Sequence, residues 1–201
     1  MLREQKLRNL TQLLGDIDAC RVCEAAIGFT PRPVLQFSEQ SRIVICGQAP
    51  GKRVHESGRP FTDPSGDRLR QWLGVSSETF YDKRCVAVIP MGFCFPGYDD
   101  KGSDKPPRPE CAPLWRRELL SHLRHPTLTI LLGRYAMEWH GIGEKKQSLD
   151  AIVAAWRQNR PAFYALPHPS WRNSGWLKRH PWFEAELLPQ LQADVQSALQ
   201  A

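Results

Sequence analysis

The sequence contains no long hydrophobic run: no apolar segment among its 201 residues approaches the roughly 18 residues that a transmembrane helix needs. The first ten residues, MLREQKLRNL, are charged and lack the apolar centre of a secretory signal. The sequence also has no internal repeat, low-complexity tract or interdomain linker. We therefore expect a cytoplasmic, monomeric protein with no membrane partner.

The composition is that of a globular chain, with 41% hydrophobic and 24% charged residues. Its length suits one domain over residues 1–201, in which residues 1–40 form an N-terminal helix and a cysteine-bearing arm. Lysine and arginine number 27 against 21 aspartate and glutamate residues, which gives a formal net charge of +6. A basic balance favours polyanionic partners such as nucleic acid.

Four short apolar runs predict four buried strands, at residues 42–46, 84–89, 127–132 and 162–166. Helical patterns lie around them, at residues 1–18, 65–72, 110–123, 134–140, 149–157 and 181–199. Residues 19–40 and the Gly- and Pro-rich stretch 47–64 predict irregular loops. Strands that alternate with helices imply a three-layer α/β/α fold with a central, mainly parallel four-stranded sheet.

Two unusual loops follow predicted strands. Gly47-Gln-Ala-Pro-Gly51 follows the first strand and can present backbone N–H groups and the Gln48 side chain to a ligand, although no Gly-Lys-Ser/Thr follows to make it a phosphate loop. In the second loop, after the last strand, His168 stands between two prolines, which restricts the backbone around it. Because ligands bind at the carboxyl ends of parallel strands, we expect both loops at one edge of the sheet.

Six cysteines are present: Cys20, Cys23, Cys46, Cys85, Cys94 and Cys111. The chain is neither small nor evidently secreted, so metal binding or buried thiols are better explanations than disulfides. Cys46 and Cys85 fall within strand patterns and are predicted to be small buried hydrophobic residues.

The loops in combination carry a specific pattern. GQAPG at 47–51, GRPF at 58–61, SG at 65–66 and HPS at 168–170 occur in that order. This pattern resembles the uracil-DNA glycosylase superfamily, and within it the iron–sulphur (family 4-like) branch. GFCFPG at 92–97 and PWFEAELLPQL at 181–191 are similar to a bacterial subgroup of that superfamily. The resemblance extends from about Cys20 to the C-terminus.

The resemblance implies a cofactor. Four of the cysteines match the layout of the cluster ligands in that branch: Cys20, Cys23, Cys94 and Cys111. In the family, the cluster is structural and ties an N-terminal arm to the loop after the second strand. An all-cysteine quartet can hold a [4Fe–4S] cluster, with zinc as the alternative.

The resemblance also implies roles in excising a flipped base. His168 would donate to the uracil oxygen that gains charge, and Phe61 would stack on the base. Gly47, Gln48, Ala49 and Pro50 would line the base pocket. The candidate DNA contacts are Ser170, Trp171, Arg172 and Asn173.

Three positions depart from the pattern of the family. Gln48 replaces a glutamate and cannot take a proton from water at neutral pH. Asp63 replaces a glycine and places a new carboxylate beside the pocket, and Pro90 stands where the family has the asparagine that reads the edge of uracil. Gln48 and Asp63 join His168 as candidate catalytic residues, while Asp63, His55 and Glu56 remain alternative acids or bases.

Two functions from different classes fit these observations. The first is a DNA-repair glycosylase that removes uracil or another deaminated base from single- or double-stranded DNA. The second is a nucleic-acid-binding or damage-sensing module with little or no catalysis, which the loss of the glutamate and the asparagine favours. A hydrolase of free nucleosides or nucleotides is a third possibility, and the Trp- and Arg-rich HPS loop argues against it.

Overall fold

The computed structural model describes residues 8–144 and 146–201. Its centre is a sheet of four parallel strands in the order β2-β1-β3-β4. The strands are β1 (Ile43–Cys46), β2 (Val86–Val88), β3 (Leu128–Leu132) and β4 (Phe163–Leu166). All four were predicted within two residues, because each is an apolar run buried on both faces of the sheet.

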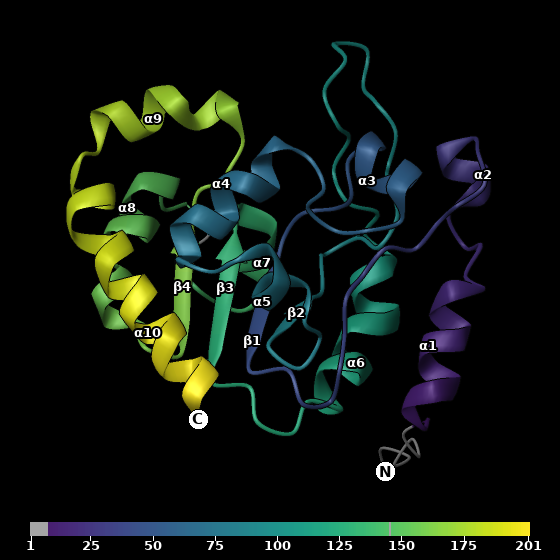
Figure 1. Cartoon of the computed structure of the whole chain (residues 1–201). Helices are drawn as coiled ribbons and strands as arrows, with labels where there is room; N and C mark the ends of the chain where they lie inside the picture. Colours follow the sequence, from purple (N-terminus) through teal and green to yellow (C-terminus); the bar gives the residue numbers. More distant parts are fainter. Residues whose placement is uncertain (1–7, 145) are drawn as a thin grey trace.

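Helices cover both faces of this sheet (Figure 1). They are α1 (Leu10–Asp18), α2 (Glu24–Ile27), α3 (Lys52–Ser57), α4 (Pro64–Leu73), α5 (Ser77–Tyr81), α6 (Arg117–Ser121), α7 (Arg134–Trp139), α8 (Leu149–Ala154), α9 (Ser174–Arg179) and α10 (Leu188–Gln200). π-Helical turns at Ala112–Arg116 and Phe183–Leu187 lead into α6 and α10. The predicted three-layer α/β/α fold is confirmed.

The core is formed where the helices meet the sheet. Helix α4 begins at Pro64, after Asp63, and ends at Gly74, whose φ of 65° suits a glycine after a helix. Its apolar face is buried, and Trp72 contacts Phe183 edge-to-face with ring centroids 5.0 Å apart. This contact joins α4 to the C-terminal helices on the same face of the sheet.

The N-terminal arm attaches to the domain at two places. Arg8 forms a salt bridge with Glu118 of α6 and lies over the Trp115 ring, 5.0 Å from its centroid. Gln36 forms an antiparallel bridge with Val88, so the arm covers the outer edge of β2. The expected helix over 1–18 is seen from Leu10 onward, and residues 1–7 lie outside the described residues.

Several helices were not expected. The stretch 47–64 is not wholly irregular, because α3 runs from Lys52 to Ser57 between Gly51 and Gly58. These two glycines bound the helix, and Gly58 ends it with a φ of 69°. Helices α2 and α5 were also missed, and the C-terminal helical region begins earlier, at Ser174. Helices of so few turns leave little periodicity in a sequence.

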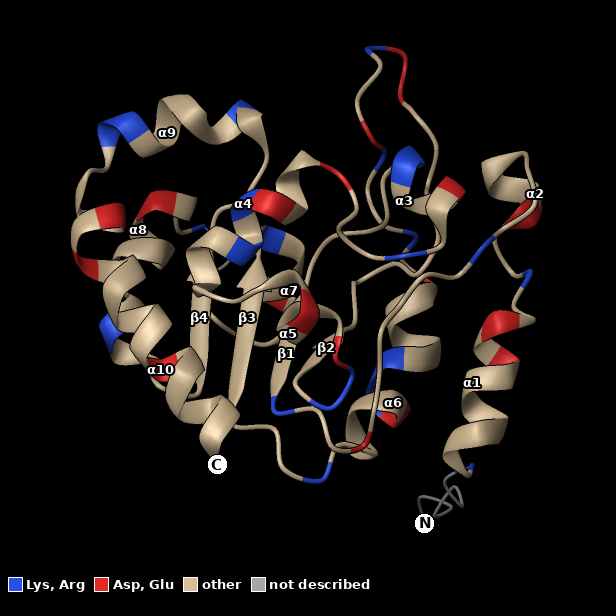
Figure 2. Cartoon of the chain, in the orientation of Figure 1, with Lys and Arg blue, Asp and Glu red and all other residues tan. Residues whose placement is uncertain are grey.

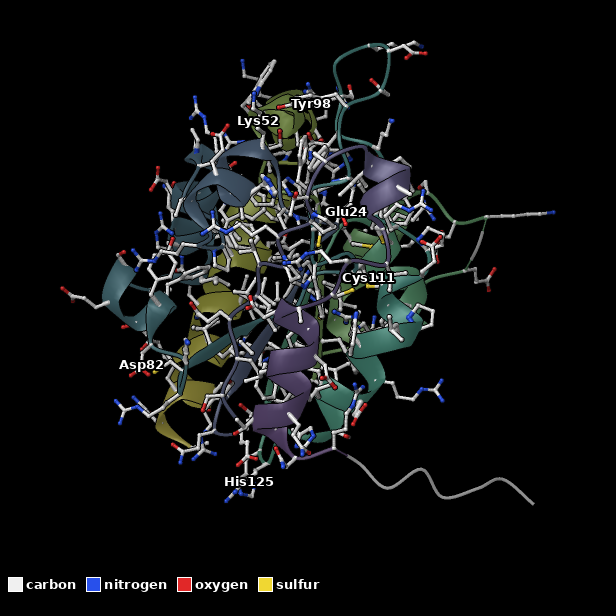
Figure 3. The ribbon with its side chains drawn as sticks, turned by 90° about the vertical axis from the view of Figure 1, so that its right-hand side faces the viewer. Glu24, Lys52, Asp82, Tyr98, Cys111 and His125 are labelled. Atoms are coloured by element: carbon white, nitrogen blue, oxygen red, sulfur yellow. The ribbon has the colours of Figure 1, made fainter. Side chains whose placement is uncertain are left out.

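Among the described residues, no helix is both long enough and apolar enough to cross a membrane. The loops after the strands gather at one end of the sheet, near Lys52 and Tyr98, whereas Asp82 and His125 lie toward the opposite end (Figure 3).

Candidate active site and cysteine pocket

A cavity opens where β1, β2 and β4 end; we call it the strand-end pocket. The space that its walls enclose, including the open mouth, is about 590 Å³. Its lining residues are Val34, Gly47, Gln48, Ala49, Pro50, Gly51, Val54, Pro60, Phe61, Asp63, Ser65, Val88, Pro90, Asp104 and His168. The GQAPG, GRPF and HPS motifs therefore meet in one pocket, at the edge of the sheet where the sequence predicts them.

The side chains divide this pocket into an apolar interior and a polar mouth. The interior has an apolar wall, which is formed in part by the buried side chains of Val34, Val54 and Val88. Asp63 is half-buried, and Asp104 is exposed at the rim.

Phe61 is held in an unusual backbone conformation. Its φ of 55° is the only positive value found for a non-glycine residue in the described part of the chain, and such a conformation costs about 1–2 kcal/mol. Tyr81 Oη donates to the Phe61 carbonyl at 3.0 Å. A Cβ at Gly66 would lie 1.9 Å from that carbonyl oxygen, so the position tolerates only glycine. Backbone strain of this kind is typical of functional sites.

His168 is positioned by its own loop. The Asn173 amide donates to the His168 carbonyl at 2.7 Å, and Arg68 Nη1 donates to the Ser170 carbonyl at 2.9 Å. Burial lowers the pKa of His168, and the negative charge of Asp63 opposes that shift. Near neutral pH the imidazole is therefore uncharged and can donate one N–H.

The three candidate acids or bases have different places. Only Asp63 lines the pocket, and its carboxylate accepts hydrogen bonds from Ser65 Oγ at 2.8 and 2.9 Å. The His55 ring packs edge-to-face on Phe29, and Glu56 pairs with Lys52 at 4.0 Å. Neither His55 nor Glu56 lines the strand-end pocket.

Gln48 and Pro90 define the altered part of the pocket. Gln48 Nε2 donates to the Lys105 carbonyl at 3.3 Å, so its amide contacts the loop between Cys94 and Cys111. Pro90 is buried in the wall and offers no side-chain hydrogen bond. Asp104, which the sequence analysis missed, enters the pocket from the same loop. A lone aspartate in a long loop gives no signal of its own.

The expected DNA contacts form a short 3₁₀ turn, Trp171–Asn173, that Ser170 caps by accepting from Arg172 N. Trp171 is 73% exposed, and the Arg172 guanidinium lies 5.9 Å from its ring centroid. Lys and Arg residues on α3, α4 and α9 surround this end of the molecule (Figure 2). The Asn173 amide is already occupied by the His168 carbonyl, which makes it a support for the loop.

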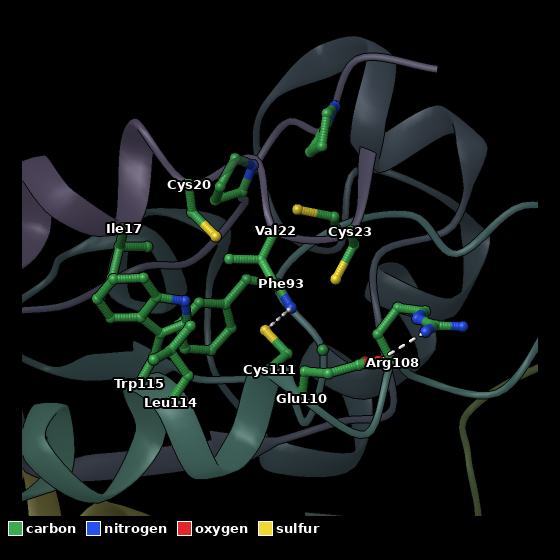
Figure 4. A pocket seen from close by; sticks show the side chains of 14 residues that line it. Ile17, Cys20, Val22, Cys23, Phe93, Arg108, Glu110, Cys111, Leu114 and Trp115 are labelled. Atoms are coloured by element: carbon green, nitrogen blue, oxygen red, sulfur yellow. Dashed lines mark hydrogen bonds and ion pairs between the residues drawn. The ribbon is translucent and has the colours of Figure 1, made fainter. Parts of the chain in front are cut away.

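A second cavity, the cysteine pocket, lies between the arm and the start of α6 (Figure 4). Cys20, Cys23, Cys94 and Cys111 all line it, together with apolar side chains that include Phe93 and Trp115. Burial raises the pKa of Cys94 to about 12 and that of Cys111 to about 11. Within residues 8–144 and 146–201, no three metal-binding side chains converge tightly enough to hold a single ion.

The two remaining cysteines differ from each other. Cys46 is fully buried as expected, but Cys85 is only half-buried because it precedes β2. Cys46 belongs to a polar cluster that the sequence analysis missed. Arg116, fully buried, directs Nη2 to Cys46 Sγ at 3.3 Å and to His140 Nε2 at 3.1 Å, and donates to the Ile89 and Pro90 carbonyls.

The chain matches the model of a known protein family. The family described as "Uracil DNA glycosylase superfamily" matches residues 35–192, which is most of the chain and includes every strand and all residues that line the strand-end pocket except Val34. With the parallel sheet and the meeting of GQAPG, GRPF and HPS in one pocket, this match shows that the chain belongs to the uracil-DNA glycosylase superfamily.

Proposed function

We propose that this protein is a DNA-repair glycosylase that flips out uracil or another deaminated base and hydrolyses its N-glycosidic bond. The observation that carries the proposal is the strand-end pocket, which is lined by both the strained Phe61 and the neutral His168. Membership of the superfamily supports glycosylase chemistry on DNA. The reaction class is the general part of the proposal, and the identity of the excised base is its more specific part.

Each group has a task in this reaction. The extruded base enters the apolar interior and stacks on Phe61. When the C1′–N bond breaks, its electron pair stays on the base, and the His168 N–H stabilises the oxygen where that charge collects. A neutral imidazole does this without carrying a buried positive charge into the site. Gln48 orients a polar group or water but takes no proton.

The same fold supports the binding-module alternative through a specific observation. Pro90 supplies no side-chain donor or acceptor, and Gln48 supplies no carboxylate. A protein that bound damaged DNA through Trp171 and Arg172 without excision would need neither group.

Single-turnover cleavage assays separate the two functions. Oligonucleotides that carry uracil, hypoxanthine or xanthine are incubated with the protein, and abasic sites are converted to strand breaks with alkali. We expect excision of at least one of these bases. The absence of excision, with retained binding to the same oligonucleotides, would establish the binding module instead.

We further propose that Cys20, Cys23, Cys94 and Cys111 hold a [4Fe–4S] cluster. The donor set fits the group: four thiols line one cavity with apolar walls, and the Phe93 N–H donates to Cys111 Sγ at 3.3 Å. A cluster is wider than one ion, so its four ligands stand farther apart than those of a single metal. When bound, it would act as a structural link between the arm and the loop that follows β2.

Protein purified without oxygen tests this proposal. We expect iron and acid-labile sulphide in equal amounts and a broad visible absorption that bleaches on reduction. Cys94→Ser should remove the absorption, whereas Cys85→Ser, outside the cysteine pocket, should retain it. Stoichiometric zinc without colour would assign the quartet to zinc, and protein without metal would refute both assignments.

A further inference from the structure

The segment between Gly97 and Lys105 forms a small hairpin beside the strand-end pocket. Lys105 N donates to the Gly97 carbonyl at 2.9 Å, Asp99 N donates to the Ser103 carbonyl at 2.8 Å, and Tyr98 forms a bridge with Asp104. At the tip, the Asp99 carboxylate accepts from the backbone of Lys101 and Ser103. These contacts give the hairpin a defined shape, and Figure 1 shows it rising from the end of the molecule where the strands end.

The root of the hairpin is joined to the pocket. Gln48 donates to the Lys105 carbonyl, and Asp104 Oδ2 would lie only 3.6 Å from a Cβ placed on Gly51. The hairpin is thus hydrogen-bonded to the GQAPG turn at Gln48 and lies close to it at Gly51. The Asp104 carboxyl lines the mouth of the same pocket as His168 and Phe61.

The two carboxylates at this mouth differ in their partners. Asp63 accepts two contacts from Ser65 Oγ and acts electrostatically on His168. For Asp104, no side-chain hydrogen bond is found in the part of the chain that the structure describes. Desolvation and the charge of Asp63 raise the pKa of Asp104, and the Arg172 charge opposes the shift. Its carboxylate is therefore available to a ligand.

The position of Asp104 indicates which part of the substrate it faces. A base that fills the apolar interior leaves its glycosidic bond and sugar at the mouth. The sugar becomes positively charged as that bond breaks, and a carboxylate at the rim stabilises this charge. Gln48, at the family's glutamate position, has no carboxylate to offer.

We propose that Asp104 is a second catalytic carboxylate, which faces the sugar and takes over the task that Gln48 cannot perform. This inference rests on the proposed glycosylase function. The C1′–N bond breaks with its electron pair on the base, and a water oxygen then bonds to C1′. Asp104 accepts the proton that this water loses and passes it to solvent, and the departing base anion takes up a proton from solvent.

Two abasic-site analogues test the charge directly and without turnover. A duplex with a cationic pyrrolidine at the abasic position mimics the charged sugar, and a duplex with a neutral tetrahydrofuran is its matched control. At low salt, we expect the protein to bind the cationic analogue at least about tenfold more tightly, because nearby opposite charges attract strongly in a partly desolvated site. Asp104→Asn should abolish most of this preference.

The control variant is Asp100→Asn, which removes the same charge from the exposed tip of the hairpin. It should keep both the preference and the excision rate, whereas Asp104→Asn should lower the single-turnover rate by at least about tenfold. Thermal midpoints of both variants are compared with that of the parent to establish that they fold.

The outcomes separate this inference from the proposed function. If Asp104→Asn keeps the preference and the rate, or if Asp63→Asn alone loses the preference, the inference is overturned while excision by the parent stands. If the parent excises no base but Asp104 still provides the preference, the proposed function fails and the placement of Asp104 at the sugar is supported.

Discussion

The strand-end pocket and the cysteine pocket both take residues from one chain segment but differ in construction. The segment from Pro90 to Cys111 contributes Pro90 and Asp104 to the first pocket, and Phe93, Cys94 and Cys111 to the second. The strand-end pocket is built on the ends of buried strands, whereas the cysteine pocket is closed by an arm from outside the sheet. The core of the fold thus supports the first site directly, and the second depends on what ties the arm down.

Arg116 connects the two pockets. It follows Cys111 by five residues, and its guanidinium donates to the Pro90 carbonyl at 3.0 Å. No carboxylate contacts it among the described residues, and its partners are two carbonyls, the Cys46 sulphur and His140. A fully buried charge held in this way couples the start of α6 to the end of β2.

The largest effect on activity is expected in the strand-end pocket. His168→Ala should lower the single-turnover excision rate by about 10²–10³-fold, because one preformed donor to the developing negative charge is lost. Asp63→Asn should be no more damaging, and Gln48→Ala should be the mildest of the three. Visible absorption and iron content should not change in any of them. An unchanged rate for His168→Ala would contradict the role of the HPS loop.

The next effect should not distinguish the strand-end pocket from the cysteine pocket, because Arg116 is connected to both. Arg116→Ala leaves two buried carbonyls without their charged donor and should lower the free energy of unfolding by about 3 kcal/mol or more. Urea unfolding measures this loss. As a control, Arg124→Ala removes an exposed salt bridge with Glu39 and should cost about 1 kcal/mol or less. Equal losses in the two variants would show that Arg116 is not a structural link.

A smaller effect concerns the exposed turn beside the strand-end pocket. Arg172→Ala should reduce the slope of log affinity against log salt by about 0.9 on duplex DNA, the value for one lost phosphate contact. Binding curves at several salt concentrations give this slope. Arg124→Ala, between α6 and β3, should leave it unchanged. An affinity that is insensitive to salt in the parent would argue against a phosphate-binding surface.

The last expected effect is a pH dependence of stability, which develops only over a limited pH window. Burial and the Arg116 charge lower the pKa of His140 to about 4 from its ordinary 6.5. Between these values the unfolded chain binds a proton that the folded protein does not, so stability rises with pH and is lost as pH falls from about 6.5 toward 4. His140→Gln, which keeps an acceptor for Arg116 but does not titrate, should weaken this dependence.

Urea midpoints of the parent and His140→Gln at pH values on either side of this window provide the measurement. His125→Asn, at an exposed histidine, is the control and should retain the pH dependence of the parent. A parent and a His140→Gln variant with parallel pH profiles would show that another group dominates.

Much of the fold was predictable because each strand is a continuous apolar run that ends at a glycine or proline signal. The helices were less so. Helix α3 escaped prediction because glycines bound a helix of fewer than two turns, and α5 because its sequence, SETFY, is too short to show a period. The meeting of GQAPG and HPS was also predictable, since parallel strands end at one edge of the sheet.

The sequence by itself determined the strands and the family pattern. It also determined that the motifs with Gln48, Phe61 and His168 meet at one edge of the sheet. Tertiary structure alone decided that Asp104 reaches the pocket while His55 and Glu56 do not, and that Arg116 is buried beneath Pro90. The physical reason is distance along the chain. The apolar run of a buried strand is a property of neighbouring residues, whereas the path of a long loop and the burial of a charge depend on contacts between residues far apart in sequence.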